Sequence, residues 1–194
     1  GTPDISQISG ESTAYKTVGL FDSNTKTRGT AAGNQIGVAR ARALEFDSGT
    51  AGQQDAQYKL FLFDVRMFTT LTISDTPSPT LVATHTNGGV QIKGATSGAT
   101  GFVFGSLTSG TTITLTNVVG SFSSGEKLIA SDSAETGGLI ENSSDTDLTI
   151  SSIVTSRFSD ARQVFMDDDD SGQDFTADLV LELTGETGQI ILDG

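Results

Sequence analysis

Two long runs of alternating residues, 35–46 and 57–68, dominate the hydrophobic pattern of this chain. Side chains of a β-strand point alternately to the two faces of its sheet, so each run divides into two sets. In the first run, one set is almost entirely small: Gly37, Ala39, Ala41, Ala43 and Glu45. This small face predicts that something packs unusually close to the backbone. The partner is either the C-terminal part of the same chain or a neighbouring subunit.

The second run is apolar on both faces. Phe61, Phe63 and Val65 lie on one face, and Leu60 and Leu62 lie on the other. Such a strand is typical of the middle of a sheet that is covered on both sides. The connecting residues are polar and contain glycine, which predicts an antiparallel hairpin with a long, exposed tip.

The rest of the chain predicts further strands. Residues 80–131 hold four or five short apolar segments separated by turns rich in Thr, Ser and Gly. Among them, 112–116 alternates cleanly, with Ile113 and Leu115 predicted to point inward. Later strands are predicted near 148–154, 163–166, 175–183 and 189–192. No convincing stretch repeats apolar residues at helical spacing, so the predicted fold class is all-β.

Two prolines, Pro77 and Pro79, mark a predicted domain boundary, because proline removes backbone donors from a sheet. We predict an N-terminal arm at 1–34 and a discontinuous, antiparallel β-sandwich-like body at 35–79 and 132–194. A small β-barrel or sandwich module is predicted as an insert at 80–131. The chain begins without methionine or a signal-peptide pattern and ends directly after an apolar run. We therefore expect it to be part of a longer protein.

The composition restricts the partners. A chain of 194 residues can bury a sizeable core, and its formal net charge is -13 with a pI near 4.2. Binding nucleic acid through phosphates needs clustered Lys and Arg, so the acidic balance argues against DNA, RNA and anionic membrane surfaces. There is no cysteine, hence no disulfide, and no run of ~18 apolar residues that would span a membrane.

The densest acidic cluster is the run of four aspartates at 167–170. Asp167, Asp169 and Ser171 have the spacing of the first ligands of a calcium loop, and Gly172 stands at the sixth position. The match is partial, because Asp178 replaces the final Glu and no helices flank the loop. The favoured interpretation is a solvated turn between two strands, with a Ca²⁺ site at these residues as the alternative. No other cofactor is expected.

Other candidate residues have simpler explanations. Asp145 and Asp147 are close enough in sequence to bind one cation together. However, acids spaced in this way in a polar loop usually serve to keep the surface soluble. His85 is the one imidazole, and neither a nucleophile elbow nor a zinc-ligand set accompanies it. We interpret it as a loop histidine.

Acids within the predicted strands raise the question of glycoside hydrolysis, which uses two carboxylates. Glu45 and Asp64 face each other across the predicted hairpin, and Glu182 lies in a later strand. Arg40, Arg42 and Arg66 lie on the same strands, so cross-strand ion pairs are the favoured explanation. No catalytic residue is predicted.

Two blocks resemble a known class of proteins. The first block is the Ala-Arg-rich strand followed by Tyr-Lys-Leu-Phe-Leu-Phe-Asp at 58–64. The second block is Gly-Ala-Thr-Ser-Gly at 94–98 together with residues 110–128. Both are similar to virion structural proteins of marine tailed bacteriophages, in particular tail or baseplate components of T4-like cyanophages. The resemblance implies a non-enzymatic virion component that is oligomeric and contacts copies of itself or neighbouring virion subunits. It supplies no active-site residues.

Two other classes of function are weighed against this expectation. A receptor-binding or carbohydrate-binding module of a phage particle would bind a host surface glycan through exposed aromatics, for which Phe102, Phe104 and Phe122 are the candidates. These three phenylalanines are also natural core residues of the insert. A hydrolytic enzyme is disfavoured by the single histidine and the missing motifs.

Overall fold

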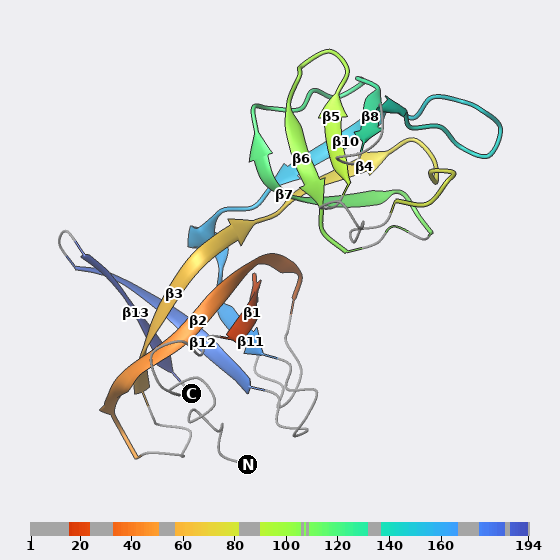
Figure 1. Ribbon diagram of the computed structural model, residues 1–194. Coiled ribbons are helices and arrows are strands. Elements are labelled where there is room, and N and C mark those ends of the chain that lie inside the picture. The colour runs from red at the N-terminus through yellow and green to blue at the C-terminus, as the bar shows by residue number, and fades with distance from the viewer. Residues whose placement is uncertain are drawn as a thin grey trace. The chain divides into compact units, whose positions relative to one another are not determined.

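The computed structural model describes residues 16–23, 33–50, 57–81, 90–105, 107, 109–131, 137–166, 175–184 and 187–193 (Figure 1). These residues form antiparallel strands and one short 3₁₀ turn, Phe158–Asp160. The predicted all-β class is therefore confirmed. No helix in these ranges is long and apolar enough to cross a membrane. The chain divides into a discontinuous unit, Gly1–Arg66 with Arg157–Gly194, and an inserted unit, Met67–Ser156.

The discontinuous unit is a closed barrel of six strands in the order β1-β11-β12-β13-β3-β2. Its strands are β1 (Lys16–Phe21), β2 (Gln35–Ser48), β3 (Gln57–Met67), β11 (Gln163–Met166), β12 (Phe175–Thr184) and β13 (Thr187–Asp193). Because β2 and β3 are neighbours, the predicted opening hairpin is confirmed. The three C-terminal strands lie between β1 and β3 and close the barrel. They belong to the same unit as the opening hairpin, as predicted.

The described part of the small face of β2, Gly37, Ala39 and Ala41, is buried in this barrel. Ala39 lies opposite Val18 of β1, Gly37 lies opposite Leu20, and all four residues are buried. An eight-stranded barrel is only just wide enough to be filled by side chains, and width falls with strand number. A six-stranded barrel therefore favours small residues on at least one strand. The residue beside Ala39 is Val18 of the N-terminal strand β1, which neither of the two predicted partners, the C-terminal part of the chain and a neighbouring subunit, includes.

The predicted N-terminal arm at 1–34 needs a correction, because residues 16–21 form the barrel strand β1. Val18 and Leu20 are fully buried there, and β1 pairs with both β2 and β11. The local pattern did not identify this strand, because one of its two pairing partners, β11, is distant in sequence. Residues 1–15 and 24–32 lie outside the described part of the chain.

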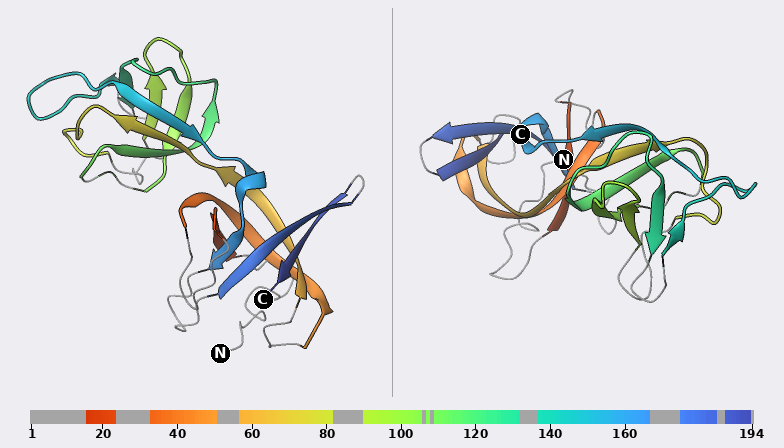
Figure 2. Two further views of the ribbon diagram at one scale, coloured as in Figure 1. Left: turned by 180° about the vertical axis from the view of Figure 1, so that it is seen from behind. Right: turned by 90° about the horizontal axis from the view of Figure 1, so that it is seen from above.

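The inserted unit is a seven-stranded antiparallel sheet in the order β10-β4-β7-β6-β5-β8-β9. Its strands are β4 (Thr69–Ile73), β5 (Gln91–Gly94), β6 (Thr100–Val103), β7 (Thr112–Val119), β8 (Leu128–Ser131), β9 (Gly138–Leu139) and β10 (Ile150–Thr155). Lys127 and Thr149 form a β-bridge, and the amide of Ile150 donates to the carbonyl of Glu126 at 3.0 Å. The start of β10 thus meets the start of β8, and the sheet curls into a nearly closed barrel (Figure 2).

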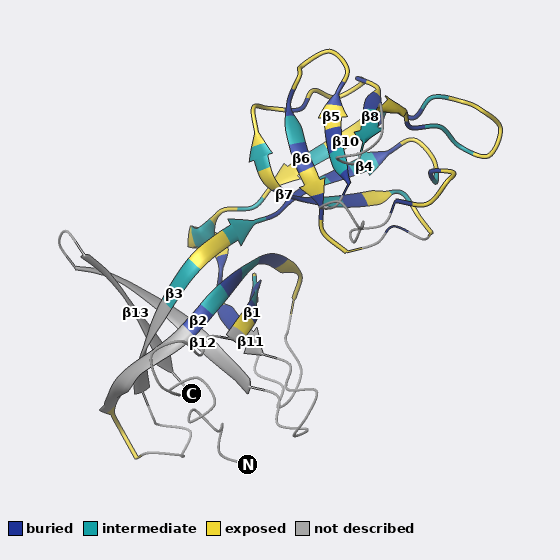
Figure 3. Cartoon of the chain, viewed as in Figure 1, coloured by how far each residue is buried: buried dark blue, intermediate teal, exposed yellow. Residues whose placement is uncertain are grey.

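The inserted unit has one core whose residues alternate with exposed positions along the strands (Figure 3). Ile113 and Leu115 of β7 are fully buried, as predicted from the alternation of 112–116. Their cross-strand neighbours include Leu71 of β4 and Val103 of β6. Glycine at position 101 is required by this packing, because a Cβ there would lie 2.9 Å from Val118.

The insert is larger than the predicted 80–131, because the structure places its ends at residues 67 and 156. β4 and β10 pair with each other, and β4 pairs with β7, so both join the inserted unit. Leu71, Ile73, Leu148 and Ile150 supply part of its core. Alternation alone identifies these segments as strands but does not say which of two sheets they join.

Candidate functional site

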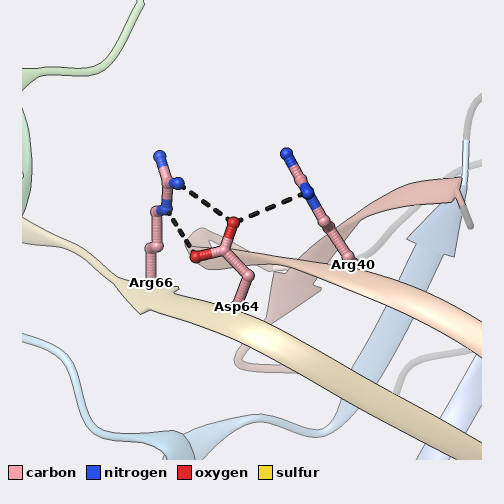
Figure 4. Close-up of polar contacts among 3 residues, drawn as sticks. All are labelled: Arg40, Asp64 and Arg66. Atoms are coloured by element: carbon pink, nitrogen blue, oxygen red, sulfur yellow. Dashed lines mark hydrogen bonds and ion pairs between the residues drawn. The ribbon is translucent and has the colours of Figure 1, made fainter.

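Asp64 is the centre of a charged cluster on the discontinuous unit (Figure 4). It accepts two hydrogen bonds from Arg66, from Nε at 3.1 Å and Nη2 at 3.0 Å. Arg40 of β2 approaches the same carboxylate, with its Nε 3.5 Å from Oδ2. Residues two apart on a strand share a face, and β2 is the neighbouring strand, so the barrel positions all three side chains.

The backbone at Asp64 is left-handed, with φ of 50°. Few residues other than glycine adopt this conformation, but Asp and Asn do so more readily than most. Asp64 therefore has two roles: it adopts the left-handed backbone conformation within β3, and its carboxylate contacts two arginines.

This geometry is that of an ion-pair network. The predicted cross-strand ion pairing is confirmed for Asp64 with Arg40, whereas the pair with Arg66 lies within β3. The three side chains together carry one net positive charge. The side chains of Glu45 and Glu182 lie outside the described residues, so the carboxylate-pair alternative stays untested.

Two substitutions separate the charge of Asp64 from its backbone conformation. Asp64→Asn removes the charge but keeps the tolerance for positive φ, so the expected loss of stability is at most about 1 kcal/mol for a partly exposed ion pair. Asp64→Val adds a β-branched side chain at positive φ, and a larger loss of about 1–3 kcal/mol is expected. Urea unfolding followed by tyrosine fluorescence measures both, and equal losses would contradict the assignment of backbone strain.

Glu126 is the second candidate, a buried carboxylate in the inserted unit with 6% of its surface exposed. Its Oε2 accepts hydrogen bonds from the amides of Thr96 and Ser97, at 3.0 and 2.8 Å. Its Oε1 accepts from the Ser97 hydroxyl at 2.8 Å and from the amide of Ser123 at 2.6 Å. One carboxylate therefore joins the 94–99 turn to the 123–126 turn.

Glycine at position 94 makes room for this carboxylate. A Cβ at Gly94 would lie 2.4 Å from Ser97 Oγ and 2.6 Å from Glu126 Oε2. Both atoms are held by the hydrogen bonds just described, so neither can move aside without breaking one. The Gly-Ala-Thr-Ser-Gly segment thus has a structural role as the cradle of Glu126.

The pKa of Glu126 results from two opposed effects. Burial raises the pKa, but the hydrogen bonds from Ser97, Ser123 and Thr96 outweigh burial and hold it below its ordinary value of 4.5. The carboxylate is therefore ionised at neutral pH and serves as a hydrogen-bond acceptor.

A pH dependence of stability follows from this lowered pKa. The unfolded chain binds the proton more readily than the folded chain, so the contribution of ionised Glu126 is fully present above about pH 4.5 and is lost as pH falls through the folded pKa. We expect the stability difference between the wild type and Glu126→Gln to shrink between pH 7 and pH 3, measured by urea unfolding followed by circular dichroism. A difference that is equal at both pH values would contradict the assignment.

Other acids of the inserted unit also hold loops in place. Asp147 pairs with Lys127, and Asp75 accepts a hydrogen bond from Asn142 Nδ2 at 2.9 Å. The bond from Asn142 and a second from the amide of Thr76 lower the pKa of Asp75. Asp145 occupies a left-handed turn position. The lysine partner of Asp147 accounts for that residue without a cation shared with Asp145.

The predicted calcium ligands Asp167, Asp169 and Ser171 lie outside the described residues, as does His85. Asp178, at the twelfth position of the loop pattern, lies in β12, where it pairs with Gln163 on one side and Asp193 on the other. Within the described ranges, no group of three or more His, Cys, Asp or Glu side chains is arranged to hold a metal.

The three aromatic residues considered for sugar binding differ in their exposure to solvent. Phe122 belongs to the core, whereas Phe102 and Phe104 are 37% and 39% exposed. Phe102 lies in β6, and Phe104 directly follows the end of that strand. Phe104 also packs on Phe68, with ring centroids 4.6 Å apart.

A shallow hollow of about 240 Å³ lies elsewhere on the inserted unit. Its lining mixes polar and apolar groups, and Glu141 is the one ionisable residue among the described residues that form it. The full lining is Ser78, Pro79, Thr80, Leu81, Val90, Ala130, Ser131, Gly138, Leu139, Ile140 and Glu141. A single carboxylate beside apolar groups assigns no reaction.

The sequence pattern did not single out Glu126 as a candidate residue. The available signal was a carboxylate that directly follows Ser-Ser-Gly and precedes a buried strand. Thr96 and Ser97 lie 30 and 29 residues earlier, so no local pattern identifies them, whereas Ser123 lies only three residues earlier.

Comparisons with known proteins add no relatives. No protein-family model, curated protein or solved structure matches the chain.

Proposed function

We propose that the chain is a non-enzymatic structural component of a tailed-phage virion, in the tail or baseplate. It acts through contacts with copies of itself or with neighbouring virion subunits. The resemblance of residues 35–68 and 94–128 to such proteins motivates the proposal. The all-β architecture, with one β unit inserted into another, is compatible with it.

The observation that carries this proposal is the edge strand β10 of the inserted unit. Its exposed side chains are uncharged, and Val154 is 61% exposed. Natural edge strands usually carry charges or prolines that prevent pairing with other chains. An edge without them, in a chain of net charge -13, supports a role in subunit contacts.

Localisation tests this proposal directly. Antibodies raised against residues 67–156 should label purified particles of the phage that encodes the chain, at the tail or baseplate, in immunogold electron microscopy. Mass spectrometry of the same particles should find the chain at a constant ratio to the known tail subunits. A protein that is abundant in infected cells but missing from purified particles would overturn the proposal.

The second candidate is a host-receptor or carbohydrate-binding module of the particle. Phe102 and Phe104 favour it, because two exposed rings two residues apart offer apolar surface to the apolar side of a sugar. A glycan array probed with the full chain tests it, with Phe102→Ala as the variant that should lose the signal. An array without signal would remove this candidate and leave the structural role unaffected.

A further inference from the structure

The edge strand β10 is paired along one side only over most of its length. Ile153, Val154 and Thr155 lie opposite Leu71, Thr70 and Thr69 of β4. On the other side, the described residues provide backbone partners at Ile150, which bonds to Gly125 and Glu126 at 2.7 and 3.0 Å. The carbonyl of Ser151 also accepts a hydrogen bond from Ser124 Oγ at 3.3 Å. The segment 152–155 is thus an open edge in the part of the chain that the structure describes.

The chemistry of this edge allows it to accept another strand. Ser151, Ser152, Val154 and Thr155 are exposed, and residues 148–156 contain neither a charge nor a proline. A register shift lies between Ile150 and Ser152, and the following residues continue in regular register with β4. The bulge is therefore confined to the start of the strand. The opposite edge, β9, has only two residues.

We propose that β10 pairs antiparallel with β10 of a second copy of this chain, with Val154 facing Val154 about a two-fold axis. The inference rests on the proposed function, since it names one of its subunit contacts. Twofold pairing places the same patch on both partners, so the patch must be compatible with itself. A neutral strand meets this condition in a chain of charge -13, because no like charges face each other along it.

Pairing also buries the apolar side chain that β10 exposes most. Ile153 already packs against the core, so the neighbouring Ser152 and Val154 point to the opposite face. In the proposed register the two Val154 side chains lie side by side and remove apolar surface from water. Backbone hydrogen bonds between the two edges supply the remaining attraction, as in other cases of strand addition.

Sedimentation equilibrium of the full chain tests the proposal with two matched variants. The wild type should dimerise, and Val154→Lys should raise the dimer dissociation constant by about tenfold or more, because two like charges then face each other. Val119→Lys is the control, because Val119 is 70% exposed but lies in β7, inside the sheet order. It should dimerise like the wild type. A wild type that stays monomeric at all concentrations, or equal effects of both variants, would overturn the proposal.

Cross-linking supplies a second readout, since the chain contains no cysteine. Mild oxidation of Val154→Cys should give a disulfide-linked dimer, whereas Val119→Cys should give mainly monomer. Equal, low yields from both would contradict the register. The tests of the virion role and of β10 pairing can be distinguished. A chain that is found in particles but is monomeric would refute only the pairing. A chain that dimerises but is missing from particles would refute only the virion role.

Discussion

Replacing Glu126 by alanine is expected to lower the free energy of unfolding of the inserted unit by about 2 kcal/mol. The substitution leaves the amides of Thr96, Ser97 and Ser123 without their acceptor. Unmet donors cost about 1–3 kcal/mol each when buried, and these three residues are exposed enough for water to replace part of the loss. The 94–99 and 123–126 turns should separate as a consequence.

Amide hydrogen exchange measures this effect locally, because the two turns should lose protection before the core strand β7. Glu126→Gln is the matched control: it keeps one carbonyl oxygen and the shape of the side chain, so it should lose less than the alanine variant. Circular dichroism during urea unfolding supplies the global value, since neither Trp nor Tyr occurs in residues 67–156. Unchanged exchange at Ser97 and Ser123 in the alanine variant would refute the role of Glu126.

Replacing Ala39 by leucine is expected to destabilise the discontinuous unit by about 1–3 kcal/mol. Ala39 is 2% exposed and lies opposite Val18 inside the six-stranded barrel. A larger side chain has no free space there, so strands must shift or adopt strained rotamers.

Val38→Leu is the control for this substitution, because Val38 is adjacent but lies on the outer, partly exposed face of β2. It should change stability by less than about 0.5 kcal/mol. Both tyrosines, Tyr15 and Tyr58, belong to the discontinuous unit, so tyrosine fluorescence during urea unfolding reports on it. Equal losses for both variants would show that the small face of β2 does not point into the barrel.

Individual strands were predictable because their pattern is local. The alternation of 112–116 and of the hairpin strands reflects burial on one face or both, which any sheet imposes with period two. The runs at 163–166, 175–183 and 189–192 were identified on the same basis and differ little from β11, β12 and β13. The boundary between the units was misplaced, because Pro77 and Pro79 lie in a loop of the inserted unit.

The candidate sites were predictable only in part. The ion pair of Asp64 with Arg40 follows from the predicted pairing of their two strands, and Arg66 lies two residues from Asp64 on the same strand. Its left-handed backbone does not, because nothing in the sequence near 64 signals an irregular strand. Glu126 stayed hidden because its hydrogen-bond partners are brought to it by the pairing of β5 with β8.

By itself, the sequence determined the all-β class, the positions of most strands and the small face of β2. Each of these depends on the identity and period of neighbouring residues. The tertiary structure alone decided that β1 closes a barrel, that β4 and β10 belong to the inserted unit, and that Glu126 joins two turns. These features depend on which distant segments pair, and pairing is chosen by the burial of the whole core rather than by any local pattern.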